Sequence, residues 1–359
     1  MIPITRPFLP PFEEFVAQCR DIWDSGWVTN LGPKTTELER RLSDIAGVGA
    51  LYVSNGTLAL NLAARALELR GDVLTTPFTF VATASAMAWE GCTPRFVDID
   101  EASFNLDPTK LAAALTPDTT AIVATHVYGN PCDHEALQRF ADEHGLRLIY
   151  DAAHAFGTTY RGQSLFSLGD VSTCSFQATK LFHTAEGGAV FSADPETIAR
   201  MNSLRDFGGR FPPNQYVEPG INAKNSEIHA ALGLTILAHM EEVVRRRQEQ
   251  GRRYREALDG HVQLQQIAAG TEYNHAYIPV AFRDEAQLHD VVAALGEADV
   301  HPRRYFYPSL STVSWAPPSS TPVADRLAPR VLCLPVFHTL QRDDIDRICD
   351  IIRTTVATS

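Results

Sequence analysis

The sequence lacks the features that would indicate a membrane or secreted protein. No apolar run approaches the ~20 residues that a membrane-spanning helix requires, so no membrane partner is expected. Its first residues, MIPITRPFLPPFEEF, lack the basic-then-apolar layout of a signal peptide, and we expect a cytoplasmic location. Six cysteines occur without any Cys-x-x-Cys pair, which predicts free thiols and no metal site. Glycine and proline, at 22 residues each, are too few for a collagen-like or low-complexity chain.

Positive charge is also scarce, since 31 lysines and arginines face 43 acidic residues and the net charge is −12. An acidic surface disfavours nucleic acid, because binding to nucleic acid depends on phosphate contacts. It does not exclude a small anionic substrate, since a local basic pocket can override the overall field. The one dense basic run, Arg245–Arg247, lies among Gln and Glu residues, and we interpret it as a solvated helix face.

Lysine in particular is rare. The chain has four, namely Lys34, Lys110, Lys180 and Lys224. Lys180 is flanked by Phe176, Leu181 and Phe182, so we expect desolvation to lower the pKa of its amine. A neutral amine is what a Schiff-base nucleophile requires. The alternative is a half-buried lysine with a purely structural partner.

Short β-rich runs alternate with helical patterns from about residue 50 onward. Runs such as AIVATHV and LRLIY, separated by a helical pattern over 133–144, predict a mostly parallel sheet covered by helices on both faces. After residue 169 the rhythm changes, with paired strands expected at 171–176 and 189–192 and one long helix at 226–258. We predict a large α/β domain with an N-terminal arm over 1–240 and a smaller α+β domain over 241–359.

The block SNGTLAL at 54–60 is the first of three features at predicted strand ends, where open α/β sheets bind ligands. Asn55 and Gly56 permit a tight turn, after which Thr57 and Leu58 are expected to present free main-chain N–H groups. Such a helix N-terminus favours a phosphate group. An ordinary capped turn has the same sequence pattern and stays open as the alternative.

The second feature is Asp151, directly after the buried run LRLIY, with His154 one turn later. A carboxylate here either caps the next turn or pairs with a cationic group of a ligand. The third is Lys180. Together the three supply what pyridoxal 5′-phosphate (PLP) requires: a Schiff-base lysine, a carboxylate that keeps the pyridine nitrogen protonated, and a phosphate-binding helix N-terminus.

Ordered blocks along nearly the whole chain carry a family resemblance. They include SGWVTNLGPKTTELE at 25–39, TTPFTFVATASA at 75–86, HVYGNPCD at 126–133, DAAHAFG at 151–157, SFQATK at 175–180 and PGINAKNSE at 219–227. In these blocks the chain resembles the DegT/DnrJ/EryC1/StrS family of PLP-dependent sugar aminotransferases. The resemblance implies a type I PLP-dependent (aspartate aminotransferase-like) α/β fold, with a mostly parallel central sheet and a smaller C-terminal α+β domain.

The resemblance also implies roles for individual residues. Lys180 matches the Schiff-base lysine, which moves a proton during catalysis, and Asp151 matches the partner of the pyridine nitrogen. The other implied cofactor-binding residues are Gly56, Thr57, Leu58, Phe80, His154, Ser175 and Asn222. Phe80 matches the aromatic that stacks on the pyridine ring, although it could instead be a core residue. Asn222 matches an asparagine that reaches the phosphate of the neighbouring subunit, which implies a homodimer with shared sites; a turn residue is the alternative.

The reaction implied by the resemblance is a transamination in two halves. L-Glutamate would donate the amino group, and a keto sugar linked to a nucleoside diphosphate would receive it. The blocks look most like members that convert dTDP-4-keto-6-deoxy-D-glucose to dTDP-4-amino-4,6-dideoxy-D-glucose, in deoxyamino sugar and polysaccharide or O-antigen biosynthesis. Alternatives are C3 amination of a dTDP-3-keto-6-deoxyhexose, an aminocyclitol aminotransferase, and a non-catalytic regulatory member.

Six aromatic, basic or histidine residues are candidates for the substrate pocket. They are Trp27, Tyr128, His183, Arg210, Tyr305 and Tyr307. Trp27, Tyr305 and Tyr307 could equally pack between domains. Some positions depart from the family pattern: Ala223 follows Asn222 where a Tyr-Arg-Met run is frequent, and Gln177 replaces a common histidine. Family members that act as dehydratases carry histidine in place of Lys180, so that activity is not expected.

Overall fold

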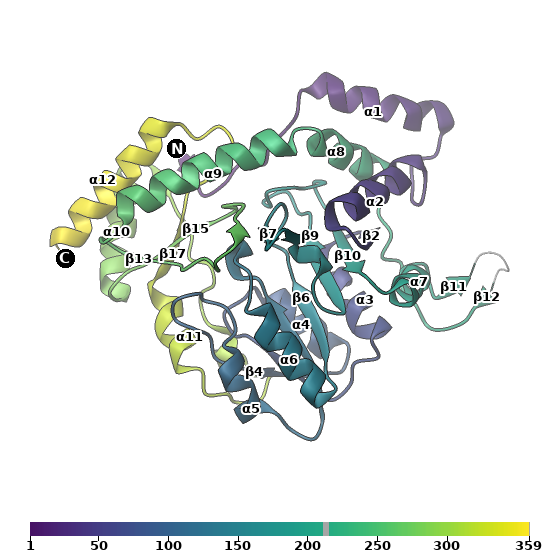
Figure 1. Ribbon diagram of the computed structural model, residues 1–359. Coiled ribbons are helices and arrows are strands. Elements are labelled where there is room, and N and C mark those ends of the chain that lie inside the picture. Colours follow the sequence, from purple (N-terminus) through teal and green to yellow (C-terminus); the bar gives the residue numbers. More distant parts are fainter. Residues whose placement is uncertain (211–214, 359) are drawn as a thin grey trace.

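The computed structural model describes residues 1–210 and 215–358, with Arg210 described for its main chain alone. Its centre is a seven-stranded sheet with the strand order β2-β10-β9-β6-β5-β3-β4 (Figure 1). The strands are β2 (Gly49–Val53), β3 (Asp72–Thr75), β4 (Thr93–Phe96), β5 (Thr119–Thr125), β6 (Arg147–Asp151), β9 (Val171–Ser175) and β10 (Gly188–Ser192). β4, β3, β5, β6 and β9 run parallel, and β10 runs antiparallel to both of its neighbours. The predicted mostly parallel sheet and the pairing of 171–176 with 189–192 are confirmed.

Helices cover both faces of this sheet because alternate side chains of its central strands point to opposite sides. Ile122 and Ala124 of β5 belong to a core that includes residues of α2 and α6, whereas Ala121 and Val123 belong to a core with α3, α4 and α7. These helices are α2 (Pro33–Ala46), α3 (Gly56–Ala66), α4 (Val81–Trp89), α6 (His134–His144) and α7 (Pro195–Leu204). The central strands are therefore buried on both sides, which explains their continuous apolar runs.

The long helix expected over 226–258 is wrong, because the structure divides it into α8 (Glu227–Leu237) and α9 (Met240–Leu258). At His239 the main chain leaves the helical range, with φ −105° and ψ 0°. The break falls where the sequence changes from apolar to strongly charged. It allows α9 to begin in the large core, at Met240, and to end in a separate C-terminal core at Leu258 (Figure 1).

The C-terminal core surrounds a small antiparallel sheet in the order β13-β15-β17. Its elements are β13 (Gln263–Leu264), β15 (Ile278–Ala281), α10 (Glu285–Glu297), β17 (Val331–Leu334) and α12 (Arg342–Thr358). β1 (Ile2–Pro3) pairs in parallel with β16 (Val300–His301), so the N-terminus lies beside the C-terminal elements (Figure 1). A domain boundary near residue 240 stays a prediction.

The remaining elements are shorter or peripheral. They are α1 (Phe12–Ser25), α5 (Leu111–Ala114), β7 (Thr159–Tyr160), β8 (Gln163–Ser164), β11 (Gly209–Arg210), β12 (Gln215–Tyr216), β14 (Thr271–Glu272) and α11 (Pro322–Leu327). The six cysteines are free thiols. Within residues 1–210 and 215–358, no helix is long and apolar enough to cross a membrane.

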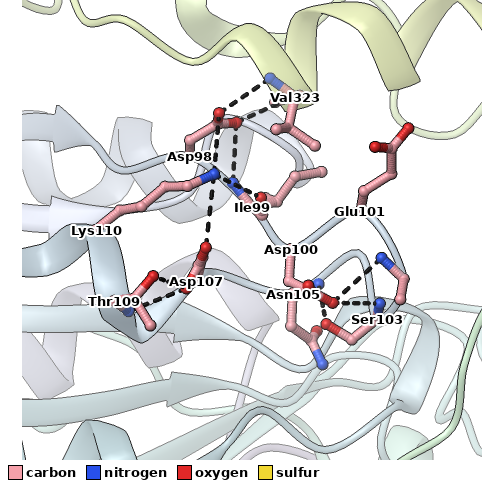
Figure 2. A network of polar contacts seen from close by, with 12 residues as sticks. Asp98, Ile99, Asp100, Glu101, Ser103, Asn105, Asp107, Thr109, Lys110 and Val323 are labelled. Carbon is pink, nitrogen blue, oxygen red and sulfur yellow. Dashed lines mark hydrogen bonds and ion pairs between the residues drawn. The ribbon is translucent and has the colours of Figure 1, made fainter.

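Asp98, just after β4, ties the large sheet to the C-terminal segment (Figure 2). Its two carboxylate oxygens accept hydrogen bonds from the main-chain N–H groups of Val323 and Ala324, each at 2.9 Å. These amides open α11, whose own preceding residue, Thr321, provides no side-chain cap. Lys110 Nζ lies 3.4 Å from the same carboxylate. Asp98 thus caps a helix more than 220 residues away in sequence.

Candidate active site

A cavity of about 400 Å³ opens at the carboxyl ends of the parallel strands, where ligands bind in open α/β sheets. Thr125, Asp151 and Ser175, the last residues of β5, β6 and β9, line it together with the beginning of α3. Its opposite wall comes from the C-terminal part of the chain and consists of Tyr277, Arg303, Tyr305 and Phe306. The cavity therefore needs both cores of the protein to form.

Lys180 lies in the loop between β9 and β10 and reaches into this cavity. Its Nζ donates a hydrogen bond to the hydroxyl of Tyr277 at 3.2 Å. Burial, the largest single influence, lowers the pKa of Lys180, but Tyr277, Asp151 and Cys174 together raise it above 10.5. The expectation of a lowered pKa is therefore wrong for the chain without ligand. The sequence showed the apolar neighbours of Lys180 and gave no sign of Tyr277.

Asp151 ends β6 with its side chain buried at the floor of the cavity. One carboxylate oxygen accepts a hydrogen bond from the Thr83 hydroxyl at 2.7 Å, and the other accepts one from the Ala153 N–H at 3.1 Å. Burial raises the pKa of Asp151 above 3.8, although both hydrogen bonds and Lys180 act in the opposite direction. A cationic group entering the cavity would offset the cost of burying this carboxylate.

His154 forms part of the same floor and is held by one main-chain contact. Its Nδ1 is 3.2 Å from the N–H of Tyr128, which makes Nδ1 an acceptor and leaves the ring proton on Nε2. Burial and the nearby Lys180 hold the pKa of His154 well below 6.5. The ring is therefore a neutral donor, and Tyr277 packs against it with ring centroids 4.5 Å apart.

The beginning of α3 and the end of β9 form a cradle for an anion. Gly56 and Thr57 open α3, and within the described residues their main-chain N–H groups meet no acceptor. A Cβ on Gly56 would come within 2.8 Å of the Ser175 Cβ, so glycine is what lets these two segments approach closely. The expectation of a free amide at Leu58 is wrong, because this N–H donates to Asn55 Oδ1 at 2.8 Å. The Asn55 side chain is an N-cap that the sequence pattern did not distinguish from a free turn.

Two further predicted residues line the cavity. Phe80 precedes α4 and is 58% exposed in the single chain, so it is not a core residue. Tyr305 lies on the C-terminal wall, and the Arg303 guanidinium is 4.8 Å from the centre of its ring.

Other predicted residues lie outside the cavity lining. Tyr128 is fully buried behind His154, and its hydroxyl donates to the Tyr305 carbonyl. His183 is buried with Nε2 at 2.9 Å from the Phe8 carbonyl, where it fixes the N-terminal segment.

Three more of the predicted residues lie on the surface of the chain. Trp27 is half exposed and donates from Nε1 to the Asn30 carbonyl at 3.0 Å. Tyr307 stacks on Arg304, with the guanidinium carbon 3.4 Å from the ring centre. Asn222 is exposed and forms an isolated bridge with Asp206. The Arg210 side chain lies outside the described residues.

The structure adds residues to the site that the sequence reasoning missed. They are Thr83, Tyr277, Arg303 and Phe306. Thr83 lies three residues after Phe80 on the first turn of α4, so a helical projection of that block could have placed both on one face. No local pattern marks the other three, because they come from a part of the chain more than 90 residues after Lys180.

Comparison with known proteins agrees with the fold. Residues 12–353 match the DegT/DnrJ/EryC1/StrS aminotransferase family, and the chain belongs to this family. It is an aminotransferase. A dTDP-4-amino-4,6-dideoxy-D-glucose transaminase from Escherichia coli is 36% identical over 98% of both chains. A UDP-N-acetyl-3-dehydro-alpha-D-glucosamine 3-aminotransferase from Acidithiobacillus ferrooxidans is 33% identical over 99% of this chain and 97% of its own.

Solved structures share the architecture. DesI, crystallised in the presence of its TDP-sugar product, superimposes with a TM-score of 0.93 at 39% identity, over 99% of this chain and 93% of its own. The type I PLP-dependent fold expected from the sequence is thereby confirmed. The family includes PLP enzymes: the PLP form of Spr1654 from Streptococcus pneumoniae superimposes with a TM-score of 0.92 at 25% identity, over 99% of both chains.

Proposed function

We propose that the protein is a PLP-dependent aminotransferase that moves the amino group of L-glutamate to dTDP-4-keto-6-deoxy-D-glucose, forming dTDP-4-amino-4,6-dideoxy-D-glucose. The observation that carries the proposal is the meeting of Lys180, Asp151 and the two free amides of α3 in one cavity. The 36% identity to a transaminase of that name supports the sugar. A cytoplasmic location stays a prediction from the sequence.

The residues of the cavity fit PLP by their chemistry. The amides of Gly56 and Thr57, with the Ser175 hydroxyl, would hold the phosphate, because a helix N-terminus favours an anion. Asp151 would hold the proton on the pyridine nitrogen, and that cation would offset the burial of its carboxylate. When bound, PLP supplies the electron sink that stabilises a carbanion at the substrate carbon.

His154 and Phe80 would orient the ring of the cofactor. Because Nδ1 of His154 is occupied by the Tyr128 N–H, Nε2–H would donate a hydrogen bond to an oxygen of the cofactor. Phe80 would pack against the cofactor ring and exclude water from it. Lys180 Nζ would take the proton from the donor carbon and later return a proton to the sugar carbon.

Arg303 provides the positive charge for an anionic substrate. It is exposed at the cavity wall, and among the described residues it forms no ion pair. The neighbouring Arg304, by contrast, is paired with Glu285 at 2.6 Å. A guanidinium binds carboxylate and phosphate oxygens with two parallel hydrogen bonds. We assign to Arg303 the binding of an oxyanion of the donor or of the nucleotide.

We also propose a homodimer with shared sites. A single chain leaves several large apolar side chains on its surface, and a subunit interface would bury some of them. They are Trp23, Trp27, Phe80, Trp89 and Phe207. The exposed Asn222 would reach the phosphate of the neighbouring site. Mixing a Lys180→Arg chain with an Asn222→Ala chain should then restore activity, because each mixed dimer holds one complete site; two inactive proteins that stay inactive after mixing would argue for separate sites.

The C3 amination of a keto sugar is the second candidate. It is favoured by the 33% identical 3-aminotransferase, whose chain is covered almost completely. The aminocyclitol alternative shares every cofactor residue and differs in the acceptor. A non-catalytic member is disfavoured because Lys180 and Asp151 line one cavity.

An absorbance spectrum tests the proposal. We expect purified protein with PLP to show the yellow band of lysine-bound cofactor, and L-glutamate to convert it to the band of the pyridoxamine form. The 4-keto sugar nucleotide should then restore the first band faster than a 3-keto isomer does. Lys180→Arg should abolish the band, whereas Lys34→Arg, which changes a lysine outside the cavity lining, should retain it. Absence of the band in the wild type would disprove PLP dependence.

A further inference from the structure

Tyr277 is the side chain that meets the reactive amine. Among the described residues it forms the hydrogen bond to Lys180 Nζ, at 3.2 Å, and Nζ lies 5.8 Å from the centre of its ring. Tyr277 directly precedes β15 of the small antiparallel sheet, whereas Lys180 follows β9 of the large sheet. The contact therefore links the two sheets. It does so at Lys180 Nζ, the atom that is expected to react.

The phenol ring is fixed by other aromatic rings before any ligand binds. Its centroid lies 4.5 Å from that of His154, 5.8 Å from that of Tyr128 and 5.8 Å from that of Tyr305. A ring packed on three sides loses little further freedom when its hydroxyl binds a partner. The hydroxyl is thus preorganised toward Lys180.

A phenol is chemically suited to a lysine that changes its protonation state. Its oxygen accepts a hydrogen bond from an ammonium group, and its O–H donates one to a neutral amine. A carboxylate in the same position could only accept and would lock the lysine as ammonium. Tyr277 can hold Nζ at one position both before and after it gives up a proton.

We propose that Tyr277 is the positioning residue for Lys180: its hydroxyl holds Nζ at one place in the cavity whenever the lysine is free of the cofactor. The proposal rests on the proposed aminotransferase function. It predicts that Tyr277 controls how easily Lys180 loses its proton.

Several titratable groups face Lys180 from the surrounding elements. They are Asp151 at the end of β6, Cys174 in β9, His154 in the loop after β6, and Tyr277 and Tyr305 from the C-terminal part. Burial favours the neutral amine, and of the opposing groups Tyr277 contributes most to raising the pKa of Lys180. Without its hydroxyl, the desolvation of Lys180 would be opposed only by the more weakly acting Asp151 and Cys174.

Because the chain has few lysines, the pKa of Lys180 can be measured in the chain without cofactor. Protein labelled with carbon-13 at the lysine ε position gives four side-chain signals, and Lys180→Arg identifies that of Lys180. We expect the Lys180 midpoint to lie above 10.5 in the wild type and to move to lower pH in Tyr277→Phe. The other three lysines should keep their midpoints in both proteins.

Tyr273→Phe is the matched control. Tyr273 is a buried tyrosine of the same segment, and its hydroxyl donates to the Tyr128 carbonyl at 2.8 Å instead of to Lys180. An equal shift of the Lys180 midpoint in Tyr273→Phe, or none in Tyr277→Phe, would overturn the proposal. Should Tyr277→Phe not fold, a nuclear Overhauser contact between the Lys180 ε protons and the Tyr277 ring protons in the wild type tests the same geometry, and its absence would overturn the proposal.

Steady-state kinetics of the enzyme with PLP bound provide a second measurement. If Tyr277 positions Nζ, Tyr277→Phe should lower kcat by about 10-fold or more in both half-reactions and change KM little, because proton transfer depends on a placed base. A change in KM alone would indicate a substrate contact and overturn the positioning role. Failure of PLP to bind the wild type would disprove the proposed function and leave the lysine titration interpretable.

Discussion

The main-chain N–H of Tyr128 donates a hydrogen bond to Nδ1 of His154 at 3.2 Å, and this contact fixes the tautomer of the imidazole. Tyr128 has a positive φ of 59°, an unusual conformation for a bulky residue, and its buried ring is packed nearly parallel to that of His154. The turn after β5 therefore determines which nitrogen of a residue after β6 carries a proton. Tyr128, expected in the substrate pocket, instead supports the pocket floor.

His154 should stay neutral with its proton on Nε2 across the physiological range. Burial and Lys180 both lower its pKa, so the ring should not titrate between about pH 5 and 8. Nitrogen-15 chemical shifts of the imidazole in the cofactor-free chain distinguish the tautomers. A midpoint near 6.5, or a proton on Nδ1, would contradict the assigned role.

Asp151→Asn should separate stability from cofactor binding. Because the pKa of Asp151 is raised in the folded chain, its carboxyl group contributes to stability in the protonated form, and this contribution is lost as pH rises through the folded pKa. At neutral pH the cofactor-free Asn variant should thus unfold at the same or a higher temperature than the wild type, and the difference should vanish in acid. PLP affinity should fall by about 10²–10⁴-fold, since removing one partner of a buried charge pair costs about 3–5 kcal/mol.

Thermal unfolding at pH 7 and in acid, together with PLP titration by absorbance, checks both halves of this prediction. A variant that binds PLP as the wild type does would remove Asp151 from the cofactor site.

Thr83→Val should destabilise the cofactor-free chain by about 1.5–3 kcal/mol at neutral pH, the usual value of a hydrogen bond to a charged group. The Thr83 hydroxyl lowers the pKa of Asp151, so its loss matters where the carboxylate is ionised and should disappear in acid. Denaturant unfolding at two pH values measures this. Thr235→Val is the control. Its buried hydroxyl donates to a main-chain carbonyl, which does not titrate, so the loss of stability should not depend on pH.

Arg303→Gln should raise KM for the anionic substrate that it binds by about 10–100-fold, since a charge-assisted hydrogen bond contributes about 1.5–3 kcal/mol. Separate KM values for L-glutamate and for the sugar nucleotide show which oxyanion is bound. Arg304→Gln is the control, because this neighbour is engaged with Glu285 and Tyr307. It should change stability more than KM; equal effects on KM would refute a specific role for Arg303.

Asp98→Ala should lower the free energy of unfolding by about 2–4 kcal/mol, because it leaves two amides of α11 without a partner. Asp100→Ala in the same loop removes a carboxylate bonded to the exposed amides of Ala102 and Ser103, and should cost about 1 kcal/mol or less (Figure 2). Urea unfolding of the two variants provides the comparison. Similar losses would mean that Asp98 does not tie the two parts together.

The local rules of chain folding explain which features could be predicted. Strands with unbroken apolar runs, such as 121–127, and the helix opened by Asp133 were predictable, because burial on both faces and capping leave direct traces in sequence. The break at His239 was not, because both halves of 226–258 are helical by composition and the bend follows from packing against two different cores.

The site was predictable to the extent that its residues follow strands in order. Asp151 and Lys180 could be found because each stands at a strand end or in a distinctive block. The raised pKa of Lys180 could not, since it depends on Tyr277, which belongs to another sheet. The hydrogen bond of the Leu58 amide could not be predicted either. The same sequence pattern fits a turn whose amides are free and one in which Asn55 caps the helix.

The two-walled cavity has a consequence for the newly made chain. Lys180 is translated 97 residues before Tyr277, which at roughly 5–20 residues per second amounts to roughly 5–20 s. The strands and the lysine thus leave the ribosome while the wall that contains Tyr277, Arg303 and Tyr305 does not yet exist. The cavity with both of its walls can therefore form only after Phe306 has been translated.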